Sequence, residues 1–120
     1  MIRSKLLQTV PSLLHGFSTR AMGDMKKDLQ ARKDFLDAVG IEGSVAIPEQ
    51  IHGTVVSDAL KPKGSDGLVG RSTMGIFTAD CVPILAVDPQ SRVVAVIHAG
   101  WRGTIGNIAK NGIESMRNEG

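Results

Sequence analysis

The sequence contains few of the residues that build large metal centres or crosslinked folds. Its 120 residues include one cysteine and three histidines. A single cysteine excludes an intramolecular disulfide framework and a zinc site of four cysteines. Three histidines exclude any centre that needs many imidazole ligands. A metal centre built by this chain alone must therefore be small.

Long apolar runs and a strong net charge are also absent. No apolar run approaches the roughly 18 residues that suggest a membrane span. The first 16 residues begin with basic side chains, but Gln8 and Pro11 interrupt their apolar stretch, so we expect no signal peptide and a cytoplasmic protein. A net charge of +2 does not indicate a nucleic-acid or membrane-surface partner.

The remaining composition is that of an ordinary globular protein. Hydrophobic residues make up 42% of the chain and charged residues 22%, which argues against extensive disorder. The length suits one small domain, and neither a linker nor an internal repeat is visible. We therefore expect a single domain over residues 1–120.

The first half of the chain gives weak signals for secondary structure. Residues 26–39 predict a helix, because Leu29, Leu36 and Val39 share one face and Gly40 suits the position after its end. The other expected elements are short strands at 14–18, 45–47 and 54–57 and a loop at 61–67.

The second half predicts a hairpin. Two apolar, β-branched runs, VPILAV (82–87) and RVVAVI (92–97), flank four residues, Asp-Pro-Gln-Ser, that suit a type I turn. Neither run alternates with polar residues, so we expect both faces of this antiparallel hairpin to be covered.

A helix is expected after the hairpin, at about residues 104–117. Its apolar face comprises Ile105, Ile108, Ala109, Gly112, Ile113 and Met116. Glycine within a helix costs about 1 kcal/mol relative to alanine, so Gly112 indicates close packing against a neighbour. The helix and the hairpin together require opposing layers.

Four short segments contain the polar residues that could carry chemistry. A loop histidine, a packed thiol and a surface arginine are the ordinary explanations for most of them. The segment IHAGWRGT (97–104) is different, because a histidine, a tryptophan and an arginine surround two glycines. The candidates are His15 and Arg20 in HGFSTR, His52 in EQIHGT, Asp80 and Cys81 in TADCVPI, and His98 and Arg102 in IHAGWRGT.

The hairpin predicts that Cys81 and His98 are neighbours, because an antiparallel hairpin brings its two open ends together. With His52 added, these residues suit a zinc site with three protein ligands and one open position. The alternative is a Cys–His pair for nucleophilic catalysis. Nothing local fixes where His52 lies, and the spacing matches neither CxxC nor HExxH.

Taken together, the segments HGFSTR, QIHGT, SDGLV (65–69), TADCVPIL and VIHAGWRGT resemble one family. Its members are described as multicopper polyphenol oxidases or laccase-domain proteins, as purine nucleoside phosphorylases and as peptidoglycan editing factors. The resemblance runs from about Leu14 to the helix after Thr104. It implies an α/β (α+β) fold, a layered sandwich of mixed β-sheet with flanking helices. It also implies a zinc ion bound by His52, Cys81 and His98.

The resemblance also implies an activity, namely phosphorolysis of adenosine, inosine and methylthioadenosine, with deamination of adenosine as a second reaction. The expected partners are then a nucleoside and phosphate. The implied catalytic residues are Cys81 and Arg102, and the implied substrate contacts are Arg20, Asp66 and Asp80. A four-copper oxidase centre needs roughly ten imidazoles, which this chain lacks, although copper could replace zinc at the same ligands.

The sequence departs from the family in two places. Only AMGDMKKD stands where family members carry a longer loop with a Ser-Leu-Asn segment, and the later Gly-Pro-Cys-Ile type segment is absent. We therefore expect a chain that lacks the C-terminal half of the family domain. Two alternatives stand beside the phosphorylase: a hydrolase that edits peptidoglycan precursors at the same metal site, and a non-catalytic zinc-binding remnant that forms a homodimer.

Overall fold

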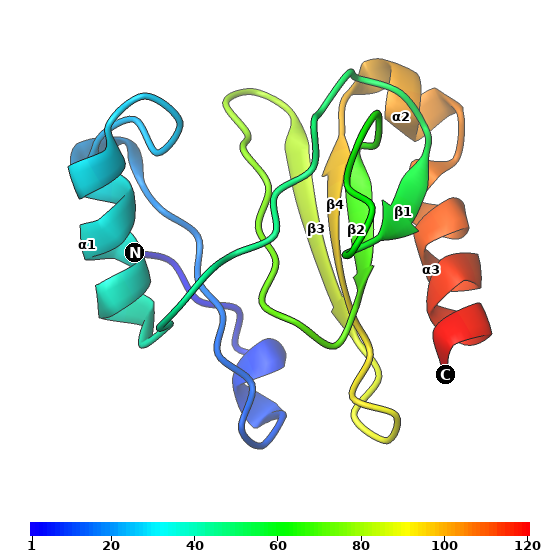
Figure 1. Ribbon diagram of the computed structural model, residues 1–120, viewed down its shortest axis with the longest axis horizontal. Helices are drawn as coiled ribbons and strands as arrows, with labels where there is room; N and C mark the ends of the chain where they lie inside the picture. The colour runs from blue at the N-terminus through cyan, green and yellow to red at the C-terminus, as the bar shows by residue number, and fades with distance from the viewer. The chain divides into compact units, whose positions relative to one another are not determined.

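The computed structural model describes residues 1–120, which form two compact units, Met1–Ser44 and Val45–Gly120 (Figure 1). The N-terminal unit contains two 3₁₀ turns, η1 (Leu7–Thr9) and η2 (Arg20–Met22), and the helix α1 (Leu29–Val39). The second unit contains every strand and two further helices.

The helix α1 begins at Leu29 rather than at residue 26. The carboxylate of Asp24 accepts hydrogen bonds from the amides of Lys26 and Lys27, which form a turn before the helix. Asp28 then caps the helix by accepting a hydrogen bond from the amide of Ala31. Gly40 ends the helix with φ at 93°, in the left-handed conformation that the sequence predicts for it.

The second unit is built on a mixed four-stranded sheet of order β1-β2-β4-β3 (Figure 1). β1 (Val56–Asp58) pairs in parallel with β2 (Gly67–Gly70). β4 (Val94–Ala99) pairs antiparallel with β2 and with β3 (Val82–Val87). The mixed sheet and its helices confirm the predicted α/β class.

The predicted hairpin is present, with β3 at its predicted bounds. β4 begins at residue 94 rather than 92, because Arg92 has φ at 63° and its amide bonds to the carbonyl of Asp88, which lengthens the turn. β4 is buried from Ala95 to Ala99, whereas the edge strand β3 is mostly half-buried. The expectation of full cover on both faces therefore holds for β4 only.

The single helix predicted at 104–117 is wrong in its bounds. The chain forms α2 (Trp101–Ile105) and α3 (Ile108–Glu119), separated by Gly106 and by Asn107 with φ at 62°. A side chain at Gly106 would collide with Thr54. Glycine at this position therefore allows the end of α2 to approach the loop before β1 closely.

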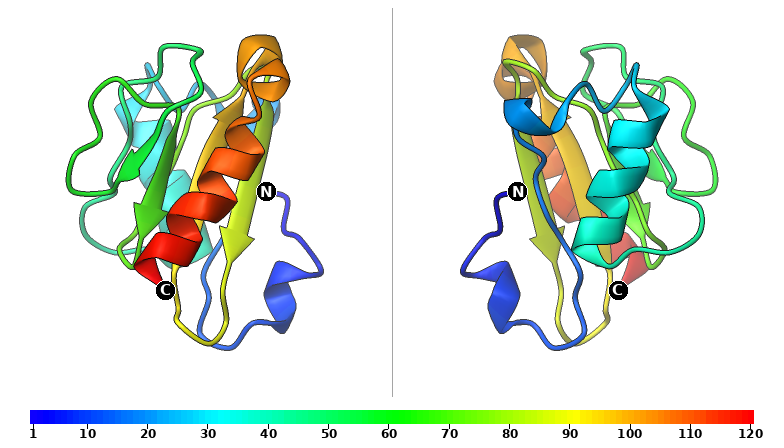
Figure 2. Two further views of the ribbon diagram at one scale, coloured as in Figure 1. Left: turned by 90° about the vertical axis from the view of Figure 1, so that its right-hand side faces the viewer. Right: turned by 90° about the vertical axis from the view of Figure 1, so that its left-hand side faces the viewer.

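α3 packs on one face of the sheet, against β1, β2 and β4 (Figure 2). Its buried positions are Ile108, Gly112 and Met116. Ile105, which the sequence places on this face, is exposed, because the break at 106–107 separates α2 from the axis of α3. Ile113 lies within α3 but is exposed as well, so the buried face is narrower than predicted. Any side chain at Gly112 would collide with Ile97 of β4, which confirms the close packing that this glycine predicts.

The other short elements differ from their predictions. Residues 14–18 and 45–47 form only isolated bridges, Ile2 with Phe17 and Ala46 with Met74. β1 lies at 56–58 rather than 54–57, and β2 was not expected at all, since glycines bound its short apolar core. None of the helices is long and apolar enough to cross a membrane.

Candidate metal centre

The loop before β1 carries His52 in an unusual backbone conformation. His52 has φ at 61°, a left-handed value that is uncommon for residues other than glycine. Its side chain is exposed. Gln50, two residues before His52, fixes the loop: its side-chain amide donates to the Phe77 carbonyl at 2.7 Å and accepts from the Phe77 amide at 2.8 Å. Gln50 thus connects the segment of His52 to the segment that leads to Cys81.

The carboxylate of Asp66, directly before β2, lies against this loop. It is fully buried and accepts hydrogen bonds from the amides of Ile51 at 3.1 Å, His52 at 2.9 Å and Gly53 at 2.9 Å. Burial by itself would raise the pKa of Asp66, but the bonds from Gly53, His98, Ile51 and His52 outweigh it and hold the pKa below its ordinary value. Asp66 is therefore a carboxylate inside the protein.

His98 is the buried member of the site, with 3% of its surface exposed. Its backbone amide donates to the Asp66 carbonyl at 2.7 Å, and its ring Nδ1 lies 2.7 Å from Asp66 Oδ2. A carboxylate can only accept, so Nδ1 carries a proton, and in the neutral ring Nε2 then presents its lone pair. Nε2 is therefore the atom of this ring that is free to bind a metal.

Cys81 lies beside His98 because of the register of the hairpin. Pro83 pairs with His98 and Val82 pairs with Ala99, which places Cys81 at the same end of the sheet. The ligand atoms of His52, Cys81 and His98 all lie within 4.8 Å of one another. The predicted proximity of Cys81 and His98 is thus confirmed, and the structure adds His52 to the group.

Gly100 lies against two members of this group. A Cβ at this position would lie 3.4 Å from both Cys81 Sγ and His52 Cδ2, so a side chain there would press on two members of the group. The rings of His52 and His98 meet edge to face, with centroids 4.9 Å apart and an interplanar angle of 82°.

The donor set fits a small divalent metal ion. One thiolate and two imidazoles are ligands typical of zinc, and of copper as an alternative. A tetrahedral zinc ion holds its ligand atoms roughly 3.5 Å apart, given bonds of about 2.1 Å to nitrogen and 2.3 Å to sulfur. Side-chain rotations that move the ligand atoms by about an ångström would bring them to that spacing. His52, Cys81 and His98 can therefore bind a metal ion.

The other predicted site residues occupy different surroundings. Asp80 precedes Cys81 and is exposed. Arg102 lies in α2, near Gly100 in the chain, with its guanidinium 4.9 Å from the ring centroid of Trp101, which is 70% exposed. Arg20 begins η2 in the N-terminal unit. Asp66, a predicted substrate contact, has both carboxylate oxygens occupied by protein donors.

Two residues hold the loop of His52 in place. The sequence did not predict Gln50 at all, and it predicted Asp66 as a substrate contact and not as a partner of the ligands. Both lie inside quoted motifs, QIHGT and SDGLV, but a motif does not say which donor a carboxylate or amide meets. The backbone amides of residues 51–53 carry no sequence signal for this contact, because every residue except proline has one.

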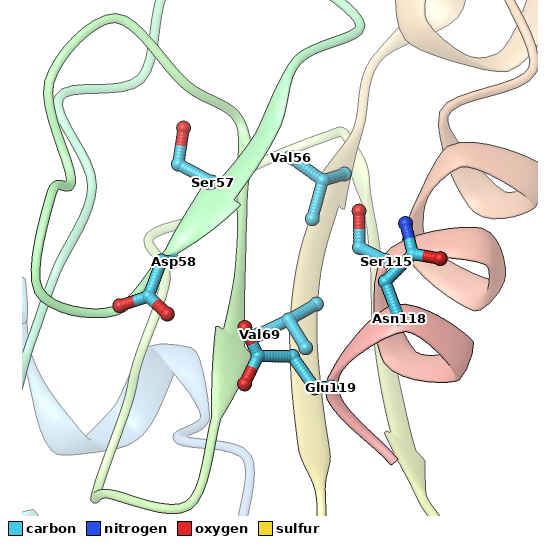
Figure 3. Close-up of a pocket in the computed structure, with 7 residues that line it drawn as sticks. All are labelled: Val56, Ser57, Asp58, Val69, Ser115, Asn118 and Glu119. Atoms are coloured by element: carbon cyan, nitrogen blue, oxygen red, sulfur yellow. The ribbon is translucent and has the colours of Figure 1, made fainter.

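A separate cavity lies between β1 and the end of α3 (Figure 3). Its volume is about 170 Å³, and it contains none of the predicted site residues. Two valines and five polar side chains line it: Val56, Ser57, Asp58, Val69, Ser115, Asn118 and Glu119. This cavity is distinct from the metal-binding group.

Comparison with known proteins connects this site to a family. Residues 15–120 match the family of multi-copper polyphenol oxidoreductase laccases. A protein from an unknown prokaryotic organism, named adenosine deaminase RL5, is 37% identical over 114 residues, covering 81% of this chain and 44% of its own length. A purine nucleoside phosphorylase from Deinococcus radiodurans is 41% identical over 76 residues, covering 59% of this chain and 30% of its own. The chain spans less than half the length of these relatives.

Solved structures show the same fold. A Neisseria meningitidis protein superposes with a TM-score of 0.62 at 34% identity, covering 74% of this chain and 39% of its own. YlmD from Geobacillus stearothermophilus superposes with a TM-score of 0.62 at 28% identity, covering 72% and 38%. The sequence match over most of the chain and the shared α/β fold agree with the resemblance on which the ligand set was predicted. The chain belongs to the multi-copper polyphenol oxidoreductase laccase family.

Proposed function

We propose that this chain binds one zinc ion through His52, Cys81 and His98 and provides the metal site of a purine nucleoside phosphorylase. The observation that carries the proposal is the convergence of one thiol and two imidazoles within 4.8 Å. Two imidazoles beside the thiol form a metal donor set, whereas a nucleophilic pair would need only one. A zinc ion with three protein ligands offers an open position where it acts as a Lewis acid.

The substrate class is suggested by the names of the relatives. Several of them, from bacteria as distant as Deinococcus and Mycobacterium, are named purine nucleoside phosphorylases. In phosphorolysis, a phosphate oxygen forms a bond to C1′ of the ribose while the bond from C1′ to the purine nitrogen breaks. The base leaves with the electron pair of that bond and takes up a proton, and ribose 1-phosphate remains.

The exposed charged residues near the metal group have roles that fit this reaction. Arg102 lies two residues after Gly100 and presents a guanidinium that suits a phosphate anion. Asp80 presents an exposed carboxylate beside Cys81, and it suits hydrogen bonds to ribose hydroxyls. Arg20, in the N-terminal unit, stays a substrate contact that only the resemblance implies. Asp66 is assigned to the support of the ligands, since its oxygens are already occupied.

Adenosine deamination is the second candidate, because the relative that is 37% identical over 114 residues carries the name adenosine deaminase. In that reaction water adds to C6 of the purine and ammonia leaves. The two reactions differ in their products. Phosphorolysis of adenosine gives adenine and ribose 1-phosphate and requires phosphate, whereas deamination gives inosine and ammonia without it.

The metal content of the purified protein tests the first half of the proposal. We expect about one zinc ion per chain by elemental mass spectrometry, which also detects copper. The variant His98→Ala should lose it. In the wild-type protein the ring of His15 lies in the N-terminal unit and accepts a hydrogen bond from the Ser4 amide. The variant His15→Ala should therefore keep its zinc. Equal zinc in all three proteins would contradict the ligand assignment.

The reaction is tested by incubating the zinc-loaded protein with adenosine, with and without phosphate, and separating the products by chromatography. Adenine formed only with phosphate supports phosphorolysis, and inosine in both arms supports deamination. A zinc-loaded protein that forms neither product would overturn the nucleoside assignment and leave the metal site in place.

A further inference from the structure

We propose that Asp66 is a shared positioning residue that sets the geometry of two ligands at once, the ring tautomer of His98 and the backbone of the loop carrying His52. This inference rests on the metal site proposed above and does not depend on the nucleoside chemistry. Asp66 itself need not touch metal or substrate, because it acts through the two histidines.

The two carboxylate oxygens of Asp66 accept hydrogen bonds from different donors. Oδ1 accepts from the amides of Ile51 and Gly53, at 3.1 and 2.9 Å. Oδ2 accepts from the amide of His52 at 2.9 Å and from Nδ1 of His98 at 2.7 Å. Three consecutive amides thus point at one buried carboxylate, and their convergence stabilises the left-handed φ of 61° at His52. A single oxygen, Oδ2, contacts both histidine ligands.

The neighbouring backbone holds Asp66 in place on both sides. Its amide donates to the Val55 carbonyl at 2.9 Å, and its carbonyl accepts from the His98 amide at 2.7 Å. The side chain is fully buried, so no water competes for its oxygens. Each oxygen of the carboxylate accepts two hydrogen bonds from the protein. Exchanging one oxygen for an NH₂ group therefore has a predictable effect on these bonds.

The substitution Asp66→Asn exchanges one acceptor oxygen for an NH₂ donor of the same size. If the NH₂ replaces Oδ2, it opposes the His52 amide, and His98 must accept through Nδ1, which moves the ring proton to Nε2. If the NH₂ replaces Oδ1, it opposes two amides, those of Ile51 and Gly53. The first orientation loses one backbone hydrogen bond instead of two, so we expect it to dominate. It places a proton on the nitrogen that should bind the metal.

Nitrogen-15 NMR of the histidine rings tests this inference in the wild-type protein first, after removal of metal with a chelator. We expect His98 to carry its proton on Nδ1. A proton on Nε2 would overturn the inference, and this measurement holds even if the variant fails to fold. In folded Asp66→Asn protein, which circular dichroism checks, the proton should be on Nε2.

Amide hydrogen exchange and zinc titration complete the test. In Asp66→Asn the His52 amide should exchange faster, while Ile51 and Gly53 stay protected. Zinc affinity, measured against a competing chelator, should fall about tenfold to a hundredfold, the usual effect of an outer partner of a ligand. Unchanged affinity and tautomer, or loss of protection at Ile51 and Gly53 instead, would overturn the inference.

Asp88→Asn is the matched control. Asp88 lies in the hairpin turn at the other end of β3, where its carboxylate accepts from the Gln90 amide and the Ser91 hydroxyl. This variant loses the same charge and should keep the His98 tautomer and the zinc affinity. A wild-type protein that binds no zinc, yet has the Nδ1–H tautomer, would refute the proposed metal function and leave the Asp66 assignment standing.

Discussion

Cys81 and His98 lie at the same end of one hairpin, two positions apart in register: His98 pairs with Pro83, and Cys81 lies just before the strand that Pro83 belongs to. Hydrogen bonds along β3 and β4 therefore hold the backbones of Cys81 and His98 at the same end of the sheet before any metal binds. His52 is the exposed member, and it comes from a loop that Asp66 and Gln50 hold in place. We expect Cys81 and His98 to be preorganised by the hairpin and His52 to complete the site.

The first prediction concerns the thiol. In Cys81→Ser a hydroxyl replaces the thiolate, and zinc bound by nitrogen and sulfur loses its soft ligand. Zinc affinity should fall by more than the roughly tenfold to hundredfold loss expected for an outer partner. Competition with a chromophoric chelator measures the affinity, and cobalt substitution should lose its sulfur-to-metal charge-transfer absorption. Full zinc affinity in the serine variant would instead favour a nucleophilic role for Cys81.

Much of this hairpin follows from the sequence, and the loop opposite it does not. The runs around residues 82–87 and 92–97 specify strands by their own β-branched content, and a hairpin must join its open ends. The position of His52 depends on Asp66, fourteen residues away, and on Gln50 contacting Phe77 across the chain. Such contacts between distant segments have no periodic signature. The residue types suggested His52 as a third ligand, and the resemblance to a family implied the same ligand, but no local pattern fixed its position.

The helices show the same division between local and distant causes. The buried stripe of Ile108, Gly112 and Met116 follows from helical spacing. The break before it lies at Gly106, which packs against Thr54, a residue that precedes β1. Asn107 then takes a left-handed conformation that asparagine tolerates better than most residues. From the apolar periodicity alone, α2 and α3 were predicted as one helix.

A second prediction follows from Gly100. Gly100→Ala places a methyl group 3.4 Å from Cys81 Sγ and from His52 Cδ2, which is at the edge of ordinary contact. Its φ of −74° suits alanine, so the fold should tolerate the change. We expect zinc affinity to fall several-fold in Gly100→Ala and to be lost in the bulkier Gly100→Val. Zinc titration of both variants checks this order, and equal affinities would mean that this glycine does not limit the site.

The third prediction tests the clamp made by Gln50. Gln50→Ala removes the 2.7 and 2.8 Å hydrogen bonds to the backbone of Phe77. Each is worth about 0.5–1.5 kcal/mol, so the free energy of unfolding should fall by roughly 1–3 kcal/mol. Urea unfolding measures this loss. Zinc affinity should also fall, because the loop of His52 is no longer tied to the segment before Cys81. Glu49 is the exposed neighbour, and its side chain makes no hydrogen bond or ion pair, so Glu49→Ala should change neither quantity.

The last prediction concerns Gly112 in the core. Alanine in a helix is more favourable than glycine by about 1 kcal/mol, but here its methyl group would collide with the end of Ile97, a residue that is itself buried. Overpacking a tight core costs about 1–3 kcal/mol, so Gly112→Ala should lower the free energy of unfolding on balance. Shortening Ile97 to valine removes the colliding atom. In the Ile97→Val background, the same Gly112→Ala change should then be neutral or stabilising. A double-mutant cycle by urea unfolding measures this coupling, and additive effects would show that Gly112 is required for a reason other than contact with Ile97.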